Sequence, residues 1–195
     1  GMADLARVTG DQSLIDACRR LFDNTVNHRM YITGGVGSTH VGEAFTFDDD
    51  LPNDTVYAET CASIALCFFG RAMLQMEIDS RYADAMELAL FNTCLAGMSL
   101  DGHNFFYVNP LEVWPEASRK DPGKRHVLPV RPKWYGCSCC PPNLARLVMS
   151  LGNYAYAASG IEVYAHQYVA GSVTLETAAG KLDIQLETGY PYDGE

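Results

Sequence analysis

The chain of 195 residues is 48% hydrophobic, a composition typical of a globular protein with a buried core. Its formal net charge of −10 argues against nucleic acid or an anionic membrane as a partner, because both would repel it. No apolar run approaches the roughly 20 residues of a membrane-spanning helix and no signal peptide opens the sequence, which predicts a cytoplasmic protein. The 7 cysteines cluster and are odd in number, which favours a reducing compartment or metal binding over a disulfide framework.

The first predicted element is an amphipathic helix over residues 11–29. Apolar side chains recur at helical spacing between residues 14 and 26, and Asp11 or Ser13 can cap the helix N-terminus. Cys18 lies on the apolar stripe and is interpreted as a core residue.

A long irregular segment is predicted from residue 30 to residue 57. Its glycines at positions 34, 35, 37 and 42 indicate tight turns and close backbone approaches, but their spacing fits no dinucleotide or phosphate-binding loop. Glu43 follows Gly42 and precedes the apolar pair Ala44–Phe45. Partial desolvation there would raise the pKa of its carboxyl and suit it to general acid catalysis. The local sequence by itself favours an ordinary solvated glutamate.

Two helices are predicted next, over residues 57–78 and 80–98. Both are apolar nearly all round, as expected of helices packed on several sides. Glu59 and Cys61, near the start of the first helix, are two positions apart and would point away from each other in a regular helix. Both can face one site only if Glu59 precedes a helix that begins near Thr60.

Residues 99–135 are expected to be irregular, with aromatic side chains such as Tyr107 that suit either a sugar-pocket wall or a buried edge. The segment Tyr135–Asn143 then places three thiols within four residues, followed by two prolines. Because proline is favoured in the first helical turn, we predict a helix from Pro141 to Ala158. Cys139 and Cys140 would lie at its N-terminus, where the helix dipole favours thiolate over thiol.

Adjacent thiolates repel each other, so a cation is the natural means of holding both. Glu59 and Cys61 would complete a site with the Cys139–Cys140 pair, and one carboxylate oxygen with three thiolates suits four-coordinate Zn²⁺. A wholly structural cysteine cluster is an open alternative. A thiol redox protein that uses Cys137, Cys139 and Cys140 is another.

Short runs of alternating polar and apolar residues begin after residue 159. They cover residues 161–169, 172–177 and 181–188 and are separated by Ala-Gly pairs, which predicts strands and hairpins. The predicted fold class is therefore mainly α, with a helical part over residues 1–159 and the start of a β domain over residues 160–195. Two or three strands are marginal alone, so they need support from other parts of the protein.

Separated motifs occur in order between residues 34 and 148: GGVGSTHVGEAFTFDDDLPND, YAETCAS, FFYVNPLE and CSCCPPNLARLV. Together they resemble glycoside hydrolase family 127, the β-L-arabinofuranosidases. The resemblance implies a catalytic (α/α)₆ barrel followed by β-sandwich domains. Of the barrel's twelve helices the chain would supply about four or five. We therefore expect a fragment without the N-terminal part of the parent protein, lacking part of the sugar pocket and prone to self-association through exposed helix faces.

The resemblance also implies roles for individual residues. The zinc ligands would be Glu59, Cys61, Cys139 and Cys140. Cys139 would be the nucleophile and Glu43, in GEAFT, the general acid/base. Thr60 and Tyr107 fall where the family contacts the sugar. The implied reaction is a retaining double displacement on an arabinofuranoside-type substrate, with zinc holding the thiolate. The alternative is a helical interaction module with a purely structural zinc site and no catalysis.

Overall fold

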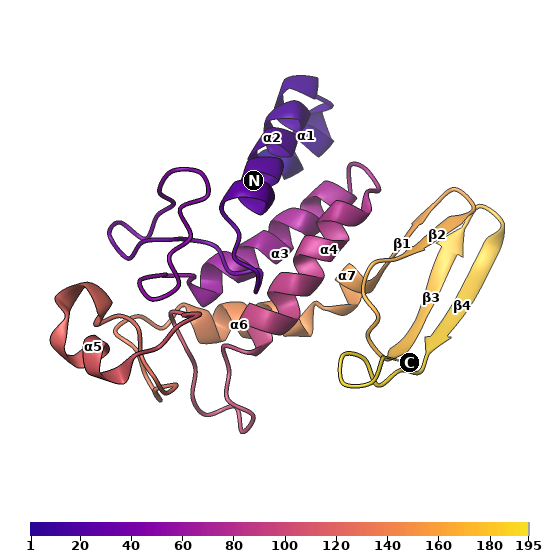
Figure 1. The fold of residues 1–195 in the computed structure, drawn as a ribbon. Helices are drawn as coiled ribbons and strands as arrows, with labels where there is room; N and C mark the ends of the chain where they lie inside the picture. The colour runs from indigo at the N-terminus through magenta and orange to yellow at the C-terminus, as the bar shows by residue number, and fades with distance from the viewer. Residues whose placement is uncertain (195) are drawn as a thin grey trace. The chain divides into compact units, whose positions relative to one another are not determined.

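Helices dominate the described part of the chain, residues 1–194 of a computed structural model (Figure 1). The helical elements are α1 (Met2–Thr9), α2 (Gln12–His28), α3 (Thr60–Leu74), α4 (Ser80–Ala89), the π-helix η1 (Leu90–Leu95), α5 (Pro115–Lys120), the 3₁₀-helix η2 (Pro122–Lys124), α6 (Cys140–Met149) and α7 (Gly152–Ala155). The strands are β1 (Tyr156–Ser159), β2 (Glu162–Ala165), β3 (Gly171–Thr177) and β4 (Gly180–Leu186). Within residues 1–194, no helix combines the length and the apolar character that crossing a bilayer requires.

The chain forms two compact units, Gly1–Arg146 and Leu147–Glu195. In the first unit, α2 confirms the earliest predicted helix, and the Asp11 side chain caps it by accepting a hydrogen bond from the Ser13 backbone N–H at 2.9 Å. The helix predicted over residues 57–78 begins at Thr60, and the one predicted over 80–98 divides into α4 and η1. Two short helices, α1 and α5, were not predicted.

The core of the first unit lies where α2, α3 and α4 meet. Phe22 of α2 packs edge-on against Phe69 of α3 and Tyr82 of α4, with ring centroids 5.3 and 4.8 Å apart. Cys18 is fully buried beside this cluster of helices, which confirms its prediction as a core residue, and Cys67 of α3 is buried as well. This core fixes the position of α3, whose N-terminus carries part of the candidate site.

The long segment between α2 and α3 is ordered by polar contacts. Ala58 donates its backbone N–H to Gly37 O at 2.8 Å, which ties the end of the segment to its middle. The Arg29 guanidinium binds the Asp48 carboxylate at 2.6 Å, so Asp48 is ion-paired rather than simply solvated. These contacts hold the loop that carries Glu43 in a defined conformation.

The second unit contains two antiparallel hairpins. Tyr156 pairs with Ala165 at one end of β1–β2, and Thr177 pairs with Gly180 next to the turn of β3–β4. The strands predicted over residues 172–177 and 181–188 are confirmed as β3 and β4. The helix predicted to reach Ala158 is wrong at its end, because α6 stops at Met149 and residues 156–159 are extended. Gly152 is a poor helix former, and polar and apolar residues alternate after it, so the sequence favours a change from helix to strand here.

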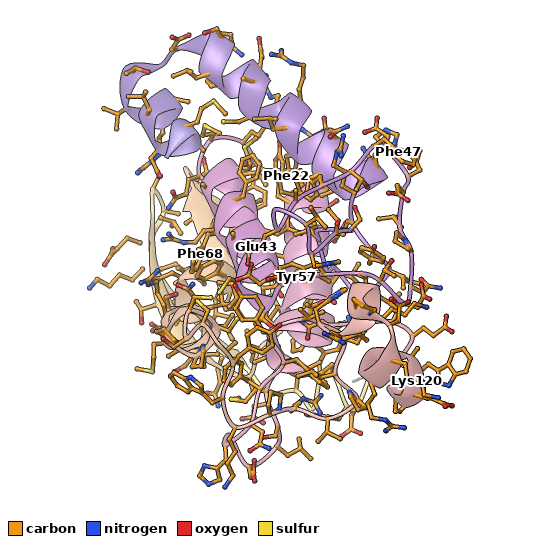
Figure 2. The ribbon with its side chains drawn as sticks, turned by 90° about the vertical axis from the view of Figure 1, so that its left-hand side faces the viewer. Phe22, Glu43, Phe47, Tyr57, Phe68 and Lys120 are labelled. Carbon is orange, nitrogen blue, oxygen red and sulfur yellow. The ribbon has the colours of Figure 1, made fainter. Side chains whose placement is uncertain are left out.

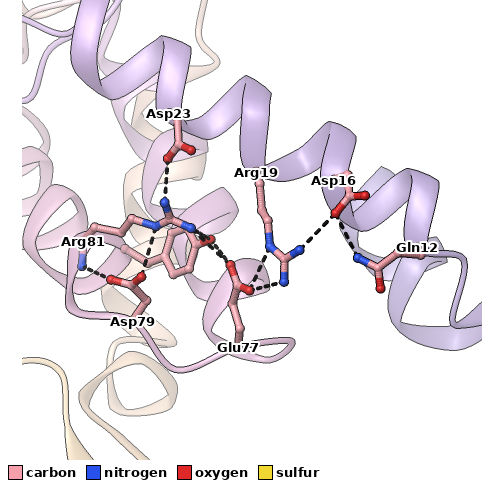
Figure 3. A network of polar contacts seen from close by, with 8 residues as sticks. Gln12, Asp16, Arg19, Asp23, Glu77, Asp79 and Arg81 are labelled. Carbon is pink, nitrogen blue, oxygen red and sulfur yellow. Dashed lines mark hydrogen bonds and ion pairs between the residues drawn. The ribbon is translucent and has the colours of Figure 1, made fainter.

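An ion-pair network joins α2 to the turn between α3 and α4 (Figure 3). Arg19 donates from Nε to Glu77 Oε2 at 2.9 Å, and Arg81 donates from Nη2 to Glu77 Oε1 at 3.2 Å. Tyr82 also donates its hydroxyl to the same carboxylate. The Arg19 hydrogen bond is the main reason that the pKa of Glu77 is lowered to about 2. Glu77 is therefore the negative centre between two arginines.

We expect Glu77→Gln to destabilise the chain by about 1–2 kcal/mol at pH 7, allowing for solvent screening of the arginines. The folded-state pKa lies below the ordinary value of 4.5, so this stabilisation is present above pH 4.5 and is lost as the pH falls toward 2. Urea unfolding at pH 7 and pH 3 measures the difference. Asp84→Asn, an exposed carboxylate on α4, is the control. A loss for Glu77→Gln that does not shrink at pH 3 would contradict the electrostatic explanation.

Candidate metal and catalytic site

Two helix N-termini meet at the candidate site. Glu59 is the N-cap residue of α3 and makes no side-chain capping bond, while Cys61 lies in the first turn. Cys139 directly precedes α6, and Cys140 is its first residue. The sequence condition that Glu59 precede a helix beginning near Thr60 is therefore met. The regular helical geometry that would separate Glu59 from Cys61 starts only after Glu59.

These four side chains converge on one point. A carboxylate oxygen of Glu59 and the three Sγ atoms all lie within 4.8 Å of one another. Cys61 Sγ and Cys140 Sγ are 3.5 Å apart, Cys139 Sγ and Cys140 Sγ are 3.9 Å apart, and Cys139 Sγ is 3.4 Å from Glu59 Oε1. Tetrahedral zinc with Zn–S bonds of about 2.3 Å places sulfurs about 3.8 Å apart. The spacing and the soft donor set therefore fit Zn²⁺.

Without a bound metal ion, the three thiols differ in pKa. The hydrogen bond with Cys140 lowers the pKa of Cys61 to about 7, whereas burial raises the pKa of Cys139 to about 12. The pKa of Cys140 is raised as well, chiefly by its hydrogen bond with Cys61. The cluster thus accommodates one negative charge readily, and a bound cation is what would allow all three thiols to be thiolates.

Three tyrosines form a layer beside the sulfurs. Tyr57 and Tyr107 meet edge to face with ring centroids 5.9 Å apart, and Tyr107 stacks on Tyr135 at 4.5 Å. Burial raises the pKa of the Tyr107 hydroxyl, and the neighbouring side chains of Cys139, Glu59 and Tyr57 raise it further. Tyr107 is 5% exposed beside the ligands, and its predicted contact with a sugar stays a prediction.

Glu43 is held by the tyrosine layer, at the edge of the site. Its backbone has φ +50°, in the left-handed region, and its Oε1 accepts a hydrogen bond from the Tyr57 hydroxyl at 2.8 Å. Figure 2 shows the two side chains directed toward each other. Glu43 is exposed, so the desolvation expected from its apolar neighbours is absent from this chain. The reason is that Phe45, which follows it, is itself 44% exposed and does not cover it.

Thr60 lies beside the ligands but faces the neighbouring loop. Its hydroxyl donates to Phe106 O at 2.8 Å and accepts from Asn109 Nδ2 at 2.9 Å. The residue is 2% exposed. Its predicted contact with a sugar stays a prediction, while its observed role is to anchor the loop that carries Tyr107, whose carbonyl accepts the Thr60 N–H at 2.9 Å.

Sequence reasoning missed three neighbours of the site. Tyr57 contacts Glu43 as described, and Asn143 donates from Nδ2 to Cys61 Sγ at 3.3 Å. His126 is half-buried, and desolvation lowers its pKa. Its ring stacks on the His40 ring with centroids 4.3 Å apart, and it lies next to the Tyr57 ring, with centroids 6.1 Å apart. A signal for Tyr57 and Asn143 was available, because each lies within two or three residues of a predicted ligand.

The fold and the cluster define a mainly helical protein in which one carboxylate and three thiols are placed where they could hold a metal ion, and comparison with known proteins gives its family. Residues 1–153 match the model of the β-L-arabinofuranosidase GH127 catalytic domain. The chain belongs to this family, which confirms the resemblance read from the motifs.

Individual relatives agree with this assignment. The chain is 48% identical over 196 aligned positions to a non-reducing end β-L-arabinofuranosidase of Bifidobacterium longum, an alignment that covers all of this chain and 29% of the relative. A GH127 β-L-arabinofuranosidase structure from Geobacillus stearothermophilus T6 superposes with a TM-score of 0.94 and 56% identity, covering 99% of this chain and 30% of that one. A second GH127 β-arabinofuranosidase structure gives 0.87 and 38%, covering 99% and 28%. The chain thus spans about 30% of the length of these relatives.

Proposed function

We propose that this chain carries the catalytic groups of a retaining β-L-arabinofuranosidase with a cysteine nucleophile. The supporting observation is the convergence of one carboxylate and three thiols within 4.8 Å, in a chain of the GH127 family. Its helices belong to an (α/α)₆ barrel and its hairpins to a β-sandwich domain. The whole protein acts on small carbohydrates of the arabinofuranoside type.

Zinc is the metal that the site is proposed to hold. The ligands are Glu59, Cys61, Cys139 and Cys140. When bound, zinc stabilises the thiolate form of its cysteines, so that a sulfur nucleophile is ionised at neutral pH. Cys139 and Cys61 are half-buried whereas Cys140 is 1% exposed, so Cys139 is more accessible to a substrate than its neighbour Cys140.

In the proposed reaction, Cys139 and Glu43 act on the two atoms of the glycosidic bond, the anomeric carbon and the departing oxygen respectively. Cys139 Sγ attacks the anomeric carbon, the carbon–oxygen bond breaks, and Glu43 gives its proton to the departing oxygen. Glu43 then takes a proton from water as that water attacks the same carbon, and the carbon–sulfur bond breaks to restore the Cys139 thiolate. Two inversions give net retention of configuration.

The tyrosine layer connects these two groups. Tyr57 donates to Glu43 Oε1, and the Tyr107 ring packs against both Tyr57 and Cys139. In the proposed mechanism Tyr57 orients the acid/base carboxylate, while Tyr107 lies next to the attacking sulfur and lines the sugar pocket. Positioning of this kind matters because small misplacements of catalytic groups cost large factors in rate.

The proposal is tested by hydrolysis of an aryl β-L-arabinofuranoside with the protein that carries this chain. We expect one equivalent of bound zinc and, by ¹H NMR during turnover, β-L-arabinofuranose as the first product, the same anomer as the substrate. Release of the α anomer would contradict the double displacement. Stoichiometric zinc without any hydrolysis would favour the structural-zinc alternative, and absence of zinc would favour a thiol redox role.

A further inference from the structure

The Asn143 side chain lies against one particular sulfur of the cluster. Its Nδ2 donates to Cys61 Sγ at 3.3 Å. Arg146, one turn further along α6, donates from Nη1 to Asn143 Oδ1 at 3.0 Å. A guanidinium has only donors, so this bond fixes the amide with its oxygen toward Arg146 and its NH₂ group toward Cys61. The orientation of the amide is therefore determined by two independent contacts.

Asn143 also joins the two halves of the site. Its backbone N–H donates to Cys139 O at 3.2 Å, which draws the residue before α6 into the helical hydrogen-bond pattern. Its side chain reaches across to Cys61 of α3. One residue thus ties the backbone that carries Cys139 and Cys140 to the sulfur supplied by the other helix.

The sulfurs differ in the groups that surround them. Cys61 Sγ accepts an amide N–H from Asn143, whereas Cys139 Sγ lies 3.4 Å from the Glu59 carboxylate, which carries no N–H to donate. A hydrogen bond donated to a metal-bound sulfur fixes its position and withdraws negative charge from it. Such a sulfur is a better permanent ligand and a weaker nucleophile than one without it.

We propose that Asn143 is a positioning residue that holds Cys61 as a permanent metal ligand and so leaves Cys139 as the reactive sulfur. This inference rests on the proposed function, because it concerns the division of labour among the sulfurs of that same site. Groups adjacent to metal ligands typically change metal affinity by about 10- to 100-fold when they are replaced. Asn143 therefore affects both metal retention and the choice of nucleophile.

The first test measures the Zn²⁺ affinity of the protein that carries this chain in reducing buffer, by competition with a chromophoric chelator. Asn143→Leu removes the donor at similar volume. Asn143→Asp keeps the shape and the partner for Arg146, and adds a carboxylate to the first helical turn, where it favours the helix. We expect both variants to bind Zn²⁺ about 10- to 100-fold more weakly. Asn92→Leu is the matched control, and its Zn²⁺ affinity is expected to stay within about twofold of the wild type, because the exposed Asn92 amide donates to Leu88 O.

The second test measures which sulfur reacts. The zinc-loaded protein that carries this chain is treated with limiting iodoacetamide, and alkylated peptides are quantified by mass spectrometry. In the wild type Cys139 should react at least about fivefold faster than Cys61, and in Asn143→Leu this preference should fall toward equality. A purely structural role would alter folding without altering the ratio of the Cys139 and Cys61 alkylation rates. Far-UV circular dichroism monitors the folding.

The outcomes separate this inference from the function on which it rests. Tight Zn²⁺ binding by the wild type, with unchanged affinity and unchanged sulfur preference in both Asn143 variants, would overturn the role of Asn143 and leave the metal site intact. A wild-type chain that binds no Zn²⁺ would overturn the metal site and the role of Asn143 together. If Asn143→Leu does not fold, Asn143→Asp alone decides between these results.

Discussion

Replacing Cys139 with serine is expected to lower kcat/KM for an aryl β-L-arabinofuranoside by at least about 10³-fold. A serine hydroxyl is not ionised at neutral pH, so the attack on the anomeric carbon loses its nucleophile. Steady-state kinetics of the protein that carries this chain measures the loss. Cys137→Ser makes the same chemical change in an exposed thiol two residues earlier, and its activity should stay within about threefold.

The same experiment needs an arm that leaves the metal ligands untouched, because Cys139→Ser can also weaken metal binding. Glu43→Gln provides it, since Glu43 is not among the four clustered ligands. General acid–base catalysis contributes about 10² to 10⁴ in rate, and the loss should be larger for an alkyl than for a nitrophenyl leaving group. Added azide should restore turnover of the activated substrate, because it attacks the intermediate without a general base.

Two results would contradict this assignment of roles. Unchanged hydrolysis in Cys139→Ser would remove the sulfur nucleophile from the mechanism, whatever the metal content. Equal losses for all leaving groups in Glu43→Gln would show that the carboxylate supports the structure instead of transferring protons. An equal loss in Cys137→Ser and Cys139→Ser would favour the redox alternative.

The sequence was most informative where local rules and chemistry agreed. Three thiols followed by two prolines predict a helix from Pro141, and α6 begins one residue earlier, at Cys140. The separation of Glu59 and Cys61 required a helix starting near Thr60, and α3 starts there. Local rules could not bring two segments some 80 residues apart together. Their shared suitability as zinc ligands suggested that they meet, and the family resemblance supported it.

The missed contacts depend on tertiary structure. The helix predicted from residue 57 fails at its first turn because Ala58 has φ +40°, although alanine is the best intrinsic helix former. Its N–H donates to Gly37 O and its carbonyl accepts Asn109 Nδ2, both at distances below 3.0 Å. These contacts from distant loops override the local preference. Tyr57 consequently lies outside α3, where its hydroxyl reaches Glu43.

Gly34 gives the second large expected effect, on stability. Its φ is +76°, and a Cβ placed there would lie 2.4 Å from the Ala89 backbone nitrogen and 2.5 Å from its Cα. Backbone atoms of α4 cannot move aside as a flexible side chain could. We expect Gly34→Ala to cost roughly 3–5 kcal/mol, combining left-handed strain with the displacement of the loop from α4.

Gly42→Ala separates these two contributions. Gly42 belongs to the same loop and has nearly the same φ, +73°, but a Cβ there meets nothing within 4 Å. Its substitution should cost only the backbone strain, about 1–2 kcal/mol. Denaturant unfolding of both variants measures the difference, which represents the close approach between the loop and α4. Equal losses would show that the loop does not pack on Ala89, and the position of Glu43 would then lack the support that this contact provides.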